Sequence, residues 1–351
     1  MSRKRITGDN IRPTSKDVSR LAGVSQATVS RAFTNESMLT PETRQRVLDA
    51  ARQLGYIPNY IARSMVSSKT NLVGIVVFRN ESPFQTSLVN LLAKELQRRG
   101  RYPVVVYQNE GESEEETISS ALMYRVDGVF ITEATDSDRI MKLCTSARVP
   151  VVLVSRNISG GKLTSVSCDD RSAGREAADY LSRMGHRKIV CLAGARDAST
   201  TQKRLEGFFI QAENNDMEIT SVFYGGYSYQ SGRHMIRQMM EAGEKSRPDA
   251  VFCTGDIIAL GAIDALRNQY DISIPEDISI IGVDDIAEAD WLSYSLTTMA
   301  QPVSKMVEIA CESLIRLVEA PDTPPQETVF KCVLHERRTV ANKLPPALSE
   351  R

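Results

Sequence analysis

The sequence predicts a small helical bundle followed by two doubly wound α/β lobes, and three observations support this fold class. Residues 14–55 contain three short helical patterns, each with a capping residue at its start. After residue 71, apolar runs alternate with amphipathic stretches, which is typical of parallel strands covered by helices on both faces. A break without strand pattern near residues 157–162 divides this region into two similar lobes. The 351 residues suffice for two or three domains.

The three expected helices are bounded by residues that suit helix ends. Serine and threonine accept hydrogen bonds from the free N–H groups of a first turn, proline fits the first helical position, and glycine suits the residue after the last turn. The expected helices are residues 15–22 with Thr14 as N-cap and Gly23 after the end, a second from the Ser25 N-cap to about Phe33, and a third from the Thr40 N-cap through Pro41 to Gly55.

Residues 56–71 show no pattern that would bury a core and are predicted to form a linker. One or two helical turns are possible around residues 62–65, but a helix this short is marginal in water by itself. We therefore expect ordered structure in this segment only against a partner.

The α/β region is expected to fold as strands separated by helices. The continuous Val and Ile runs indicate strands buried on both faces. The expected strands are residues 72–78, 102–107, 128–132, 151–154, 166–168, 188–193, 250–254 and 278–283, and the expected helices include residues 84–99, 171–184, 201–214, 231–241 and 257–268.

Charge is unevenly distributed along the chain. Residues 1–70 hold 12 Lys and Arg against 5 Asp and Glu, whereas the remainder holds 31 against 39. A basic head on an acidic body indicates a module that binds a polyanion, joined to a body with another task. Hydrophobic residues make up 42% of the chain and charged residues 25%, which excludes a wholly disordered protein.

Several classes of protein are not expected. No apolar stretch approaches the roughly 18 residues of a membrane-spanning helix. No apolar core follows the basic start Met-Ser-Arg-Lys-Arg, as a secretory signal requires. The six cysteines form no CxxC pair and lie mostly in apolar runs, which is typical of reduced thiols in a cytoplasmic protein. With only three, widely separated histidines, we expect no metal centre, and we expect no cofactor.

Residues 17–31, Asp-Val-Ser-Arg-Leu-Ala-Gly-Val-Ser-Gln-Ala-Thr-Val-Ser-Arg, have the pattern of a helix-turn-helix. This motif needs a small apolar residue in the first helix, a residue that tolerates positive φ at the turn, and buried residues from both helices. The residues that meet these demands are Ala22, Gly23, Val24 and Val29, with Val18 and Leu21 on the inner face of the first helix.

The outward face of the second helix is predicted to contact DNA. Arginine can donate two hydrogen bonds to guanine, glutamine can pair with adenine, and hydroxyls near a helix N-terminus suit phosphate oxygens. The alternative is an ordinary helical hairpin with solvated side chains. The outward residues are Gln26, Ala27, Ser30 and Arg31 for the groove, and Ser25 and Thr28 for phosphates.

Three motifs closely resemble the LacI/GalR family of bacterial transcription regulators: residues 24–31 (Val-Ser-Gln-Ala-Thr-Val-Ser-Arg), 41–44 (Pro-Glu-Thr-Arg) and 55–59 (Gly-Tyr-Ile-Pro-Asn). The resemblance continues to about Thr339. It implies a homodimer on a pseudo-palindromic double-stranded DNA operator, with Gln26, Ala27 and Arg31 at base-contacting positions. The expected domains are a disordered basic tail (1–13), the helix-turn-helix domain (14–58), a hinge helix or linker (59–71), an effector-binding and dimerisation domain (72–340) and a tail (341–351).

The resemblance also implies a role for the linker. In the family, the segment matching residues 59–65 folds into a hinge helix on DNA and wedges an aliphatic side chain into the minor groove. Here Met65 stands where leucine is usual, and methionine can still unstack a base step, although its thioether is flexible. The alternative is a disordered tether. The predicted DNA-contacting residues are Thr14, Ser25, Gln26, Ala27, Thr28, Ser30, Arg31, Asn59, Ala62 and Met65.

The α/β body resembles the periplasmic-binding-protein-like type I effector domain of the same family. A cleft between two such lobes, at the carboxyl ends of strands, suits a small polar ligand. Carboxylates and arginines follow several expected strands, and each can engage two vicinal hydroxyls of a sugar or sugar derivative. The predicted effector-contacting residues are Phe84, Gln85, Arg156, Asp169, Gln202, Arg204, Asp256, Trp291 and Asp284.

Some of these residues have structural alternatives. Arg204 and Asp285 could serve as ion-pair partners or helix caps. Asp284 is the stronger candidate for ligand contact, because it is the first polar residue after a buried apolar run. Trp291, the single tryptophan, could stack on a sugar or be buried in its lobe.

Departures from the family pattern leave the effector's identity open. Gln85 stands where a second aromatic residue is common, Gln202 where many members have arginine, and Gly255 where asparagine is usual. An anionic effector, such as a sugar acid or sugar phosphate, would be favoured by arginines near the cleft, unless these are structurally paired. The arginines in question are Arg79, Arg156 and Arg204.

Two other functions are weighed against regulation. An enzyme is not expected, because the chain has no GxSxG elbow, no GxxxxGK[ST] loop and no GxGxxG after a strand. A solute-binding protein of a sugar transport system would share the body's fold, but the missing signal peptide and the basic head argue against it. The prediction is a cytoplasmic, dimeric, effector-controlled transcriptional regulator, a repressor rather than an activator.

Overall fold

The computed structural model describes residues 13–33, 39–57, 69–78, 82–132, 137–155, 162–243 and 247–344. The chain divides into two compact units, Met1–Thr70 and Asn71–Arg351. The predictions for the hinge residues Asn59, Ala62 and Met65, for Arg79 and Arg156, and for most of both tails concern positions outside the described residues.

The first unit contains the three expected helices, α1 (Ser15–Ala22), α2 (Gln26–Ala32) and α3 (Pro41–Leu54). Their caps form as the residue types predict: the backbone N–H of Thr28 donates to Ser25 Oγ, and that of Thr43 donates to Thr40 Oγ1. Gly23 ends α1 in the left-handed region at φ 64°. The buried residues shared by the three helices are Val18, Ala22, Val29, Ala32, Val47, Ala50 and Ala51.

The prediction for Leu21 was wrong. Its side chain was expected on the inner face of the first helix, but it is 47% exposed. Val18 and Ala22, one turn apart on α1, already fill the contact with α2 and α3. Leu21 therefore falls beside the buried stripe rather than in it.

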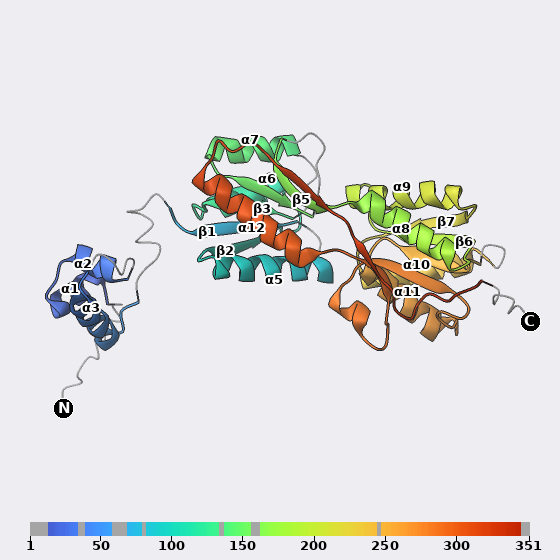
Figure 1. Ribbon diagram of the computed structural model, residues 1–351, viewed down its shortest axis with the longest axis horizontal. Coiled ribbons are helices and arrows are strands. Elements are labelled where there is room, and N and C mark those ends of the chain that lie inside the picture. Colours follow the sequence, from blue (N-terminus) through green and yellow to red (C-terminus); the bar gives the residue numbers. More distant parts are fainter. Residues whose placement is uncertain are drawn as a thin grey trace, which may run out of the picture. The chain divides into compact units, whose positions relative to one another are not determined.

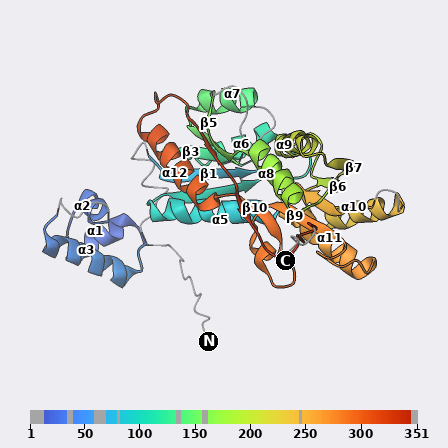
Figure 2. The same ribbon diagram turned by 45° about the vertical axis from the view of Figure 1, so that its right-hand side comes forward.

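The second unit begins with a lobe built on a six-stranded parallel sheet of order β11-β5-β4-β3-β1-β2. Helices cover both faces of the sheet (Figures 1 and 2). The strands are β1 (Leu72–Val77), β2 (Tyr102–Tyr107), β3 (Gly128–Ile131), β4 (Val151–Val154), β5 (Thr164–Cys168) and β11 (Glu327–Phe330). The helices are α5 (Pro83–Arg98), α6 (Glu114–Leu122), α7 (Ser137–Ala147) and α12 (Val303–Glu319).

The other lobe has a second six-stranded sheet of order β12-β10-β9-β8-β6-β7, in which only β12 is antiparallel to its neighbour. The strands are β6 (Lys188–Ala193), β7 (Glu218–Tyr224), β8 (Ala250–Cys253), β9 (Ser279–Asp284), β10 (Thr297–Ala300) and β12 (Val333–His335). The helices are α8 (Asp170–Arg183), α9 (Ser199–Asn214), α10 (Tyr229–Glu241), α11 (Asp256–Gln269) and the 3₁₀ turn η3 (Ala287–Asp290).

The chain passes between the lobes three times: from β5 to α8, from β10 to α12 and from β11 to β12. Sequence patterns did not indicate β7, β10, β11 or β12, which are edge strands or short segments with mixed polar composition. The second and third crossings were therefore not expected. Together with the first crossing, they give three short connections between the two sheets.

Candidate nucleic-acid interface and ligand-binding cleft

The helix α2 presents its predicted contact residues to solvent. Val29 and Ala32 are buried and fix the helix on its neighbours. This anchoring leaves one face of α2 uncovered, as a helix entering the major groove requires. On that face Ser25, Gln26, Ala27, Ser30 and Arg31 are exposed and Thr28 is half-buried.

Two of the predicted phosphate-contacting residues also have structural tasks. Ser25 Oγ lies 2.9 Å from Thr28 Oγ1 and caps α2. Thr14 donates from its backbone N–H (3.0 Å) and its hydroxyl (2.7 Å) to Asp17 Oδ2, which closes the first turn of α1. Both positions lie at helix N-termini, where backbone N–H groups and the helix dipole also favour a phosphate.

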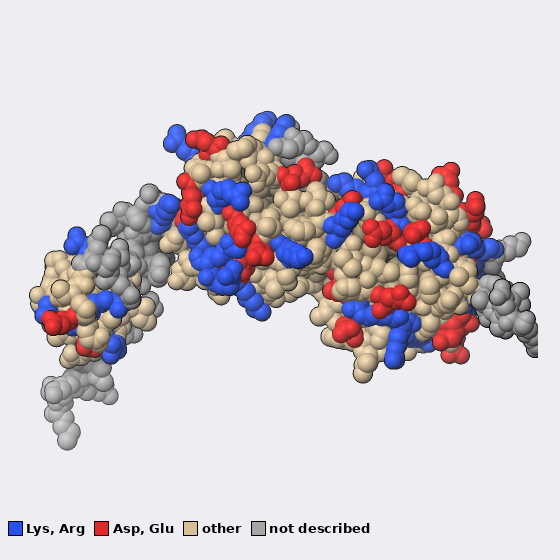
Figure 3. Space-filling view, viewed as in Figure 1, with Lys and Arg blue, Asp and Glu red and all other residues tan. Residues whose placement is uncertain are grey.

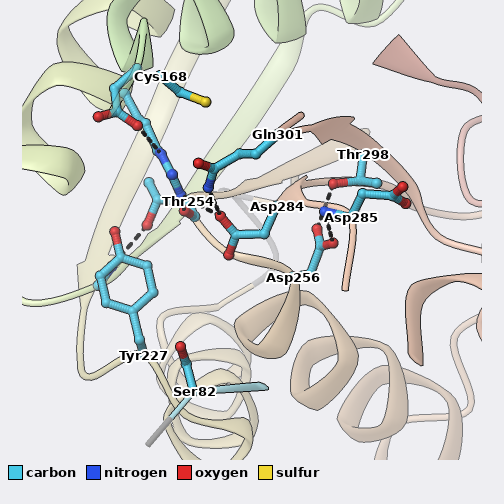
Figure 4. A network of polar contacts seen from close by, with 12 residues as sticks. Ser82, Cys168, Tyr227, Thr254, Asp256, Asp284, Asp285, Thr298 and Gln301 are labelled. Carbon is cyan, nitrogen blue, oxygen red and sulfur yellow. Dashed lines mark hydrogen bonds and ion pairs between the residues drawn. The ribbon is translucent and has the colours of Figure 1, made fainter. Parts of the chain in front are cut away.

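A buried polar network lies at the carboxyl ends of the second lobe's strands (Figure 4). The Arg204 guanidinium donates from Nε to Asp170 Oδ1 (2.8 Å), and from Nη1 to the Thr254 carbonyl (2.6 Å) and to Asp284 Oδ1 (3.1 Å). The side-chain amide of Gln301 donates to the same Asp284 oxygen at 2.7 Å. Arg204 thus bonds three other segments of the chain, and Gln301 joins the network through Asp284.

Close helix packing brings Asp170 and Arg204 together. A Cβ on Gly174 of α8 would lie 1.9 Å from the Arg204 carbonyl oxygen, and one on Gly207 of α9 would lie 1.9 Å from the Arg171 carbonyl oxygen. Only glycine allows the two backbones to approach so closely. The α8 N-terminus consequently lies within reach of the middle of α9.

The positive charge of Arg204 is compensated by the two carboxylates of the network, Asp170 and Asp284. Burial raises the pKa of Asp170 and of Asp284, and Arg204 opposes this rise in both. Burial disfavours the charged form of Arg204, but Asp284 and Asp170 hold its pKa well above the usual range. Arg204 is therefore ion-paired in the way the structural alternative describes, and it offers no excess positive charge to an anion.

Asp284 has the features expected of a functional residue. Its backbone has φ 130°, which is strained for a residue other than glycine and recurs at binding sites. Asp284 Oδ2 and Arg204 Nη2 have no hydrogen bond to any described residue. An acceptor and a donor at adjacent positions suit the hydroxyls of a polyol.

Asp256 supports this turn rather than facing a ligand. Its carboxylate accepts from the backbone N–H groups of Asp285 (2.7 Å) and Ile286 (3.1 Å) and from the Thr298 hydroxyl (2.6 Å). Burial raises its pKa to about 7, and the nearby Asp284 charge adds to the rise. These bonds occupy both carboxylate oxygens of Asp256, and they therefore favour a structural role over the predicted contact with the effector.

A pocket of about 1290 Å³ lies between the lobes. Tyr227 connects it to the network: its hydroxyl is 2.9 Å from Thr201 Oγ1, and a Cβ on Gly255 would lie 2.9 Å from its ring and 3.4 Å from Asp284 Oδ2. The lining residues are Val77, Phe78, Pro83, Tyr107, Gln108, Asn109, Glu110 and Gly111 from the first lobe, and Gly226, Tyr227, Ser228, Tyr229 and Ile257 from the second.

Several predicted effector residues lie elsewhere. Phe84 and Gln85 are buried at the start of α5, and Asp169 caps α8 by accepting from the Ser172 N–H at 2.9 Å. Gln202 is exposed, and its amide donates to the Arg196 carbonyl at 3.2 Å. Trp291 is 56% exposed and does not line the pocket, so burial in its lobe is excluded.

Sequence reasoning missed Gln301, Tyr227 and the residues from Tyr107 to Glu110. Gln301 comes directly after β10 and Tyr227 three residues after β7, two strands that the patterns did not indicate. The residues after β2 could have been found, since that strand was predicted with its observed bounds and polar residues follow it.

The described residues contain no helix that could cross a bilayer. Within the same residues, no three His, Cys, Asp or Glu side chains are grouped as a metal site would require.

Two family models match the chain. Residues 14–59 match the bacterial regulatory proteins of the lacI family, and residues 178–340 match the periplasmic binding protein-like domain. The chain is 30% identical over 337 residues to the HTH-type transcriptional regulator CelR of Thermobifida fusca, covering 93% of this chain and 98% of that protein. It is also 30% identical over 331 residues to the ribose operon repressor of Escherichia coli K12, covering 92% and 98%.

Solved structures show the same fold. The lac repressor dimer bound to operator and the anti-inducer ONPF matches with a TM-score of 0.84 at 24% identity, over 94% of this chain and 100% of that one. The complex of the regulator CelR with cellobiose matches with a TM-score of 0.69 at 29% identity, over 93% and 100%.

Proposed function

This chain belongs to the lacI family of bacterial regulatory proteins, and on that premise we propose which residues bind DNA and which bind the effector. The protein is a DNA-binding transcriptional regulator and not an enzyme. We assign base contacts to the exposed face of α2 and effector binding to the pocket above Asp284. The single observation that carries the second assignment is the strained, buried Asp284 with one unbonded carboxylate oxygen.

The DNA assignment rests on exposure and charge. Gln26, Ala27 and Arg31 occupy the uncovered face of α2 and would enter the major groove. Thr14, Ser25, Thr28 and Ser30 would contact phosphates or the groove edge. On the face in view in Figure 3, the lobes carry basic and acidic side chains side by side without a broad basic area, which favours α2 over the lobes as the DNA-binding surface.

The effector is proposed to be a sugar or sugar derivative. Arg204 Nη2 and Asp284 Oδ2 would bond neighbouring hydroxyls, and the Tyr227 ring would supply an apolar surface beside them. Among the described residues the network is not cationic, which favours a neutral sugar over a sugar acid. Two relatives are named for sugars: one is the ribose operon repressor, and a CelR structure holds cellobiose.

The regulator is proposed to act as a cytoplasmic homodimeric repressor on a pseudo-palindromic operator. Dimerisation would cover the exposed apolar side chains of Tyr102 and Val105 on the edge strand β2. Effector binding would change the angle between the lobes and thereby operator affinity, and by linkage operator binding would change effector affinity equally.

A thermal-shift screen of sugars and sugar acids tests the effector site. Wild type is expected to be stabilised by about 2.7 kcal/mol at a hundredfold excess over Kd. Asp284→Asn should lose this stabilisation, whereas Gln202→Ala, an exposed change on the same lobe, should retain it. A full shift in the Asp284→Asn variant would place the effector elsewhere.

A further inference from the structure

The residue at which the sensing unit begins is held by three polar contacts. The unit boundary falls between Thr70 and Asn71. The Asn71 backbone N–H donates to Asp127 Oδ2 at 2.8 Å, its side-chain oxygen accepts from Arg101 Nη1 at 2.8 Å, and its carbonyl accepts from the Tyr102 N–H at 2.8 Å. We call Asn71, Arg101 and Asp127 the linker clamp.

The linker clamp is shielded from water. The side chains of Arg101 and Asp127 are 12% and 7% exposed, and Arg101 Nη1 lies 3.5 Å from Asp127 Oδ2. Electrostatic contacts in such a setting are screened less than those on an open surface. Asn71 itself has φ 56°, in the left-handed region that asparagine tolerates better than most residues. These contacts hold Asn71 against the first lobe, at the residue before β1.

The helix α12 connects the linker clamp with the cleft. It begins at Val303, two residues after Gln301, whose amide bonds Asp284. At its other end Glu319 lies 3.8 Å from Arg101, and Glu312 accepts from Arg99 at 3.1 Å. A straight helix of 17 residues spans about 25 Å. Figure 1 shows α12 running from the crossings to the side of the first lobe where β1 begins.

A tight packing contact couples α12 to the clamp mechanically. A Cβ on Gly128, the residue after Asp127, would lie 2.8 Å from Leu314 Cδ1 of α12. Because packed interiors are bistable rather than continuously deformable, a shift of α12 would be passed to residues 127 and 128 instead of being absorbed. Gln301, two residues before the start of α12, thus bonds Asp284, and Leu314 within the helix packs against Gly128 beside the linker clamp.

We infer that α12 transmits the state of the cleft to the linker clamp, and that Arg101 is a positioning residue for the DNA-binding response. This inference rests on the proposed function and adds a route to it. Arg101 is not among the residues that line the effector pocket, and it would act through its bond to Asn71. If Arg101 had only a structural role, its substitution would lower the stability of the protein. It would not leave effector affinity intact while reducing the effect of the effector on DNA affinity.

The test uses the full chain with a duplex selected from a random-sequence pool by wild type. The ligand is whichever of ribose, cellobiose, glucose, gluconate and galacturonate most raises the wild-type melting temperature. In Arg101→Gln, the affinity for that compound should stay within about twofold of wild type. The factor by which the compound changes duplex affinity should fall at least about fivefold, a typical allosteric coupling. Arg98→Gln, which removes the arginine three residues earlier that pairs with Glu95 at the end of α5, should keep both.

A second measurement needs no ligand. Hydrogen exchange of the Asn71 amide should accelerate at least about tenfold in Arg101→Gln and also in Gln301→Leu, at the far end of α12, because local opening exposes that amide. Arg98→Gln should leave it unchanged. The inference is overturned if Arg101→Gln keeps the wild-type coupling factor, or if Gln301→Leu leaves exchange at Asn71 unchanged. Failure of wild type to select a duplex or bind any compound would instead reject the proposed function.

Discussion

The α2 surface and the cleft floor are built in opposite ways. Side chains on α2 are exposed, come from one short segment and depend on neighbours only for the burial of Val29 and Ala32. The side chains around Arg204 are buried and come from segments up to 131 residues apart, Asp170 to Gln301. Substitutions on the α2 surface can therefore change DNA specificity with little effect on the stability of the protein. Substitutions in the cleft floor affect ligand binding and stability together.

The largest effect is expected for Arg204→Leu. Removing the guanidinium leaves Asp170 and Asp284 as uncompensated buried carboxylates, so the free energy of unfolding should fall by about 3–5 kcal/mol. Urea unfolding of the full chain measures it. The matched control is Arg171→Leu, which breaks the exposed Arg171–Glu206 pair between the same two helices and should cost about 1 kcal/mol or less. Equal losses in both variants would mean that burial adds nothing to the cost of removing an arginine from an ion pair.

A pH dependence should follow from Asp256. Its pKa is raised to about 7 in the folded protein from an ordinary value of 3.8, so folding favours its protonated form. The stability from this group is present below about pH 4 and is lost as pH rises through 7. Wild type should therefore become less stable between pH 5 and 8, and Asp256→Asn should show a smaller decline. Identical pH profiles would mean that Asp256 titrates normally.

Arg31→Ala should weaken DNA binding. Loss of a bidentate base contact should weaken specific operator binding by about 1–3 kcal/mol, with a smaller loss on a random duplex. Competition titrations against the selected duplex and a random duplex separate base contacts from phosphate contacts. Equal weakening on both duplexes would assign Arg31 to phosphates.

The smallest effect is expected for Gln202→Ala. This side chain is exposed, and its amide donates to the Arg196 carbonyl. Its removal should change stability by no more than about 0.5 kcal/mol. A loss of effector affinity in the thermal-shift screen would instead show that Gln202 belongs to the effector-binding site.

Local patterns predicted the parts of the fold that local physics determines. Continuous apolar runs predicted β2 and β6 with their observed bounds, and caps predicted α1. The edge strand β7 and the short β10 carry no such run, because one is half-solvated and the other is supported by long-range pairing with β9. Their omission hid Tyr227 and Gln301, which follow them in the chain. Asp284 and Arg204 could be proposed from the sequence because one follows a clear buried segment and the other lies in a family motif. Their mutual bond could not be predicted, since it joins residues 80 apart.

The central claim is that DNA binding by the first unit is controlled by a ligand in the cleft of the second. The most direct measurement is the affinity of full-length wild type and Asp284→Asn for the selected duplex, each with and without the stabilising sugar. The account predicts a change of affinity on adding the sugar in wild type and none in Asp284→Asn. An equal response in both proteins, or no preference of wild type for the selected over a random duplex, would contradict it.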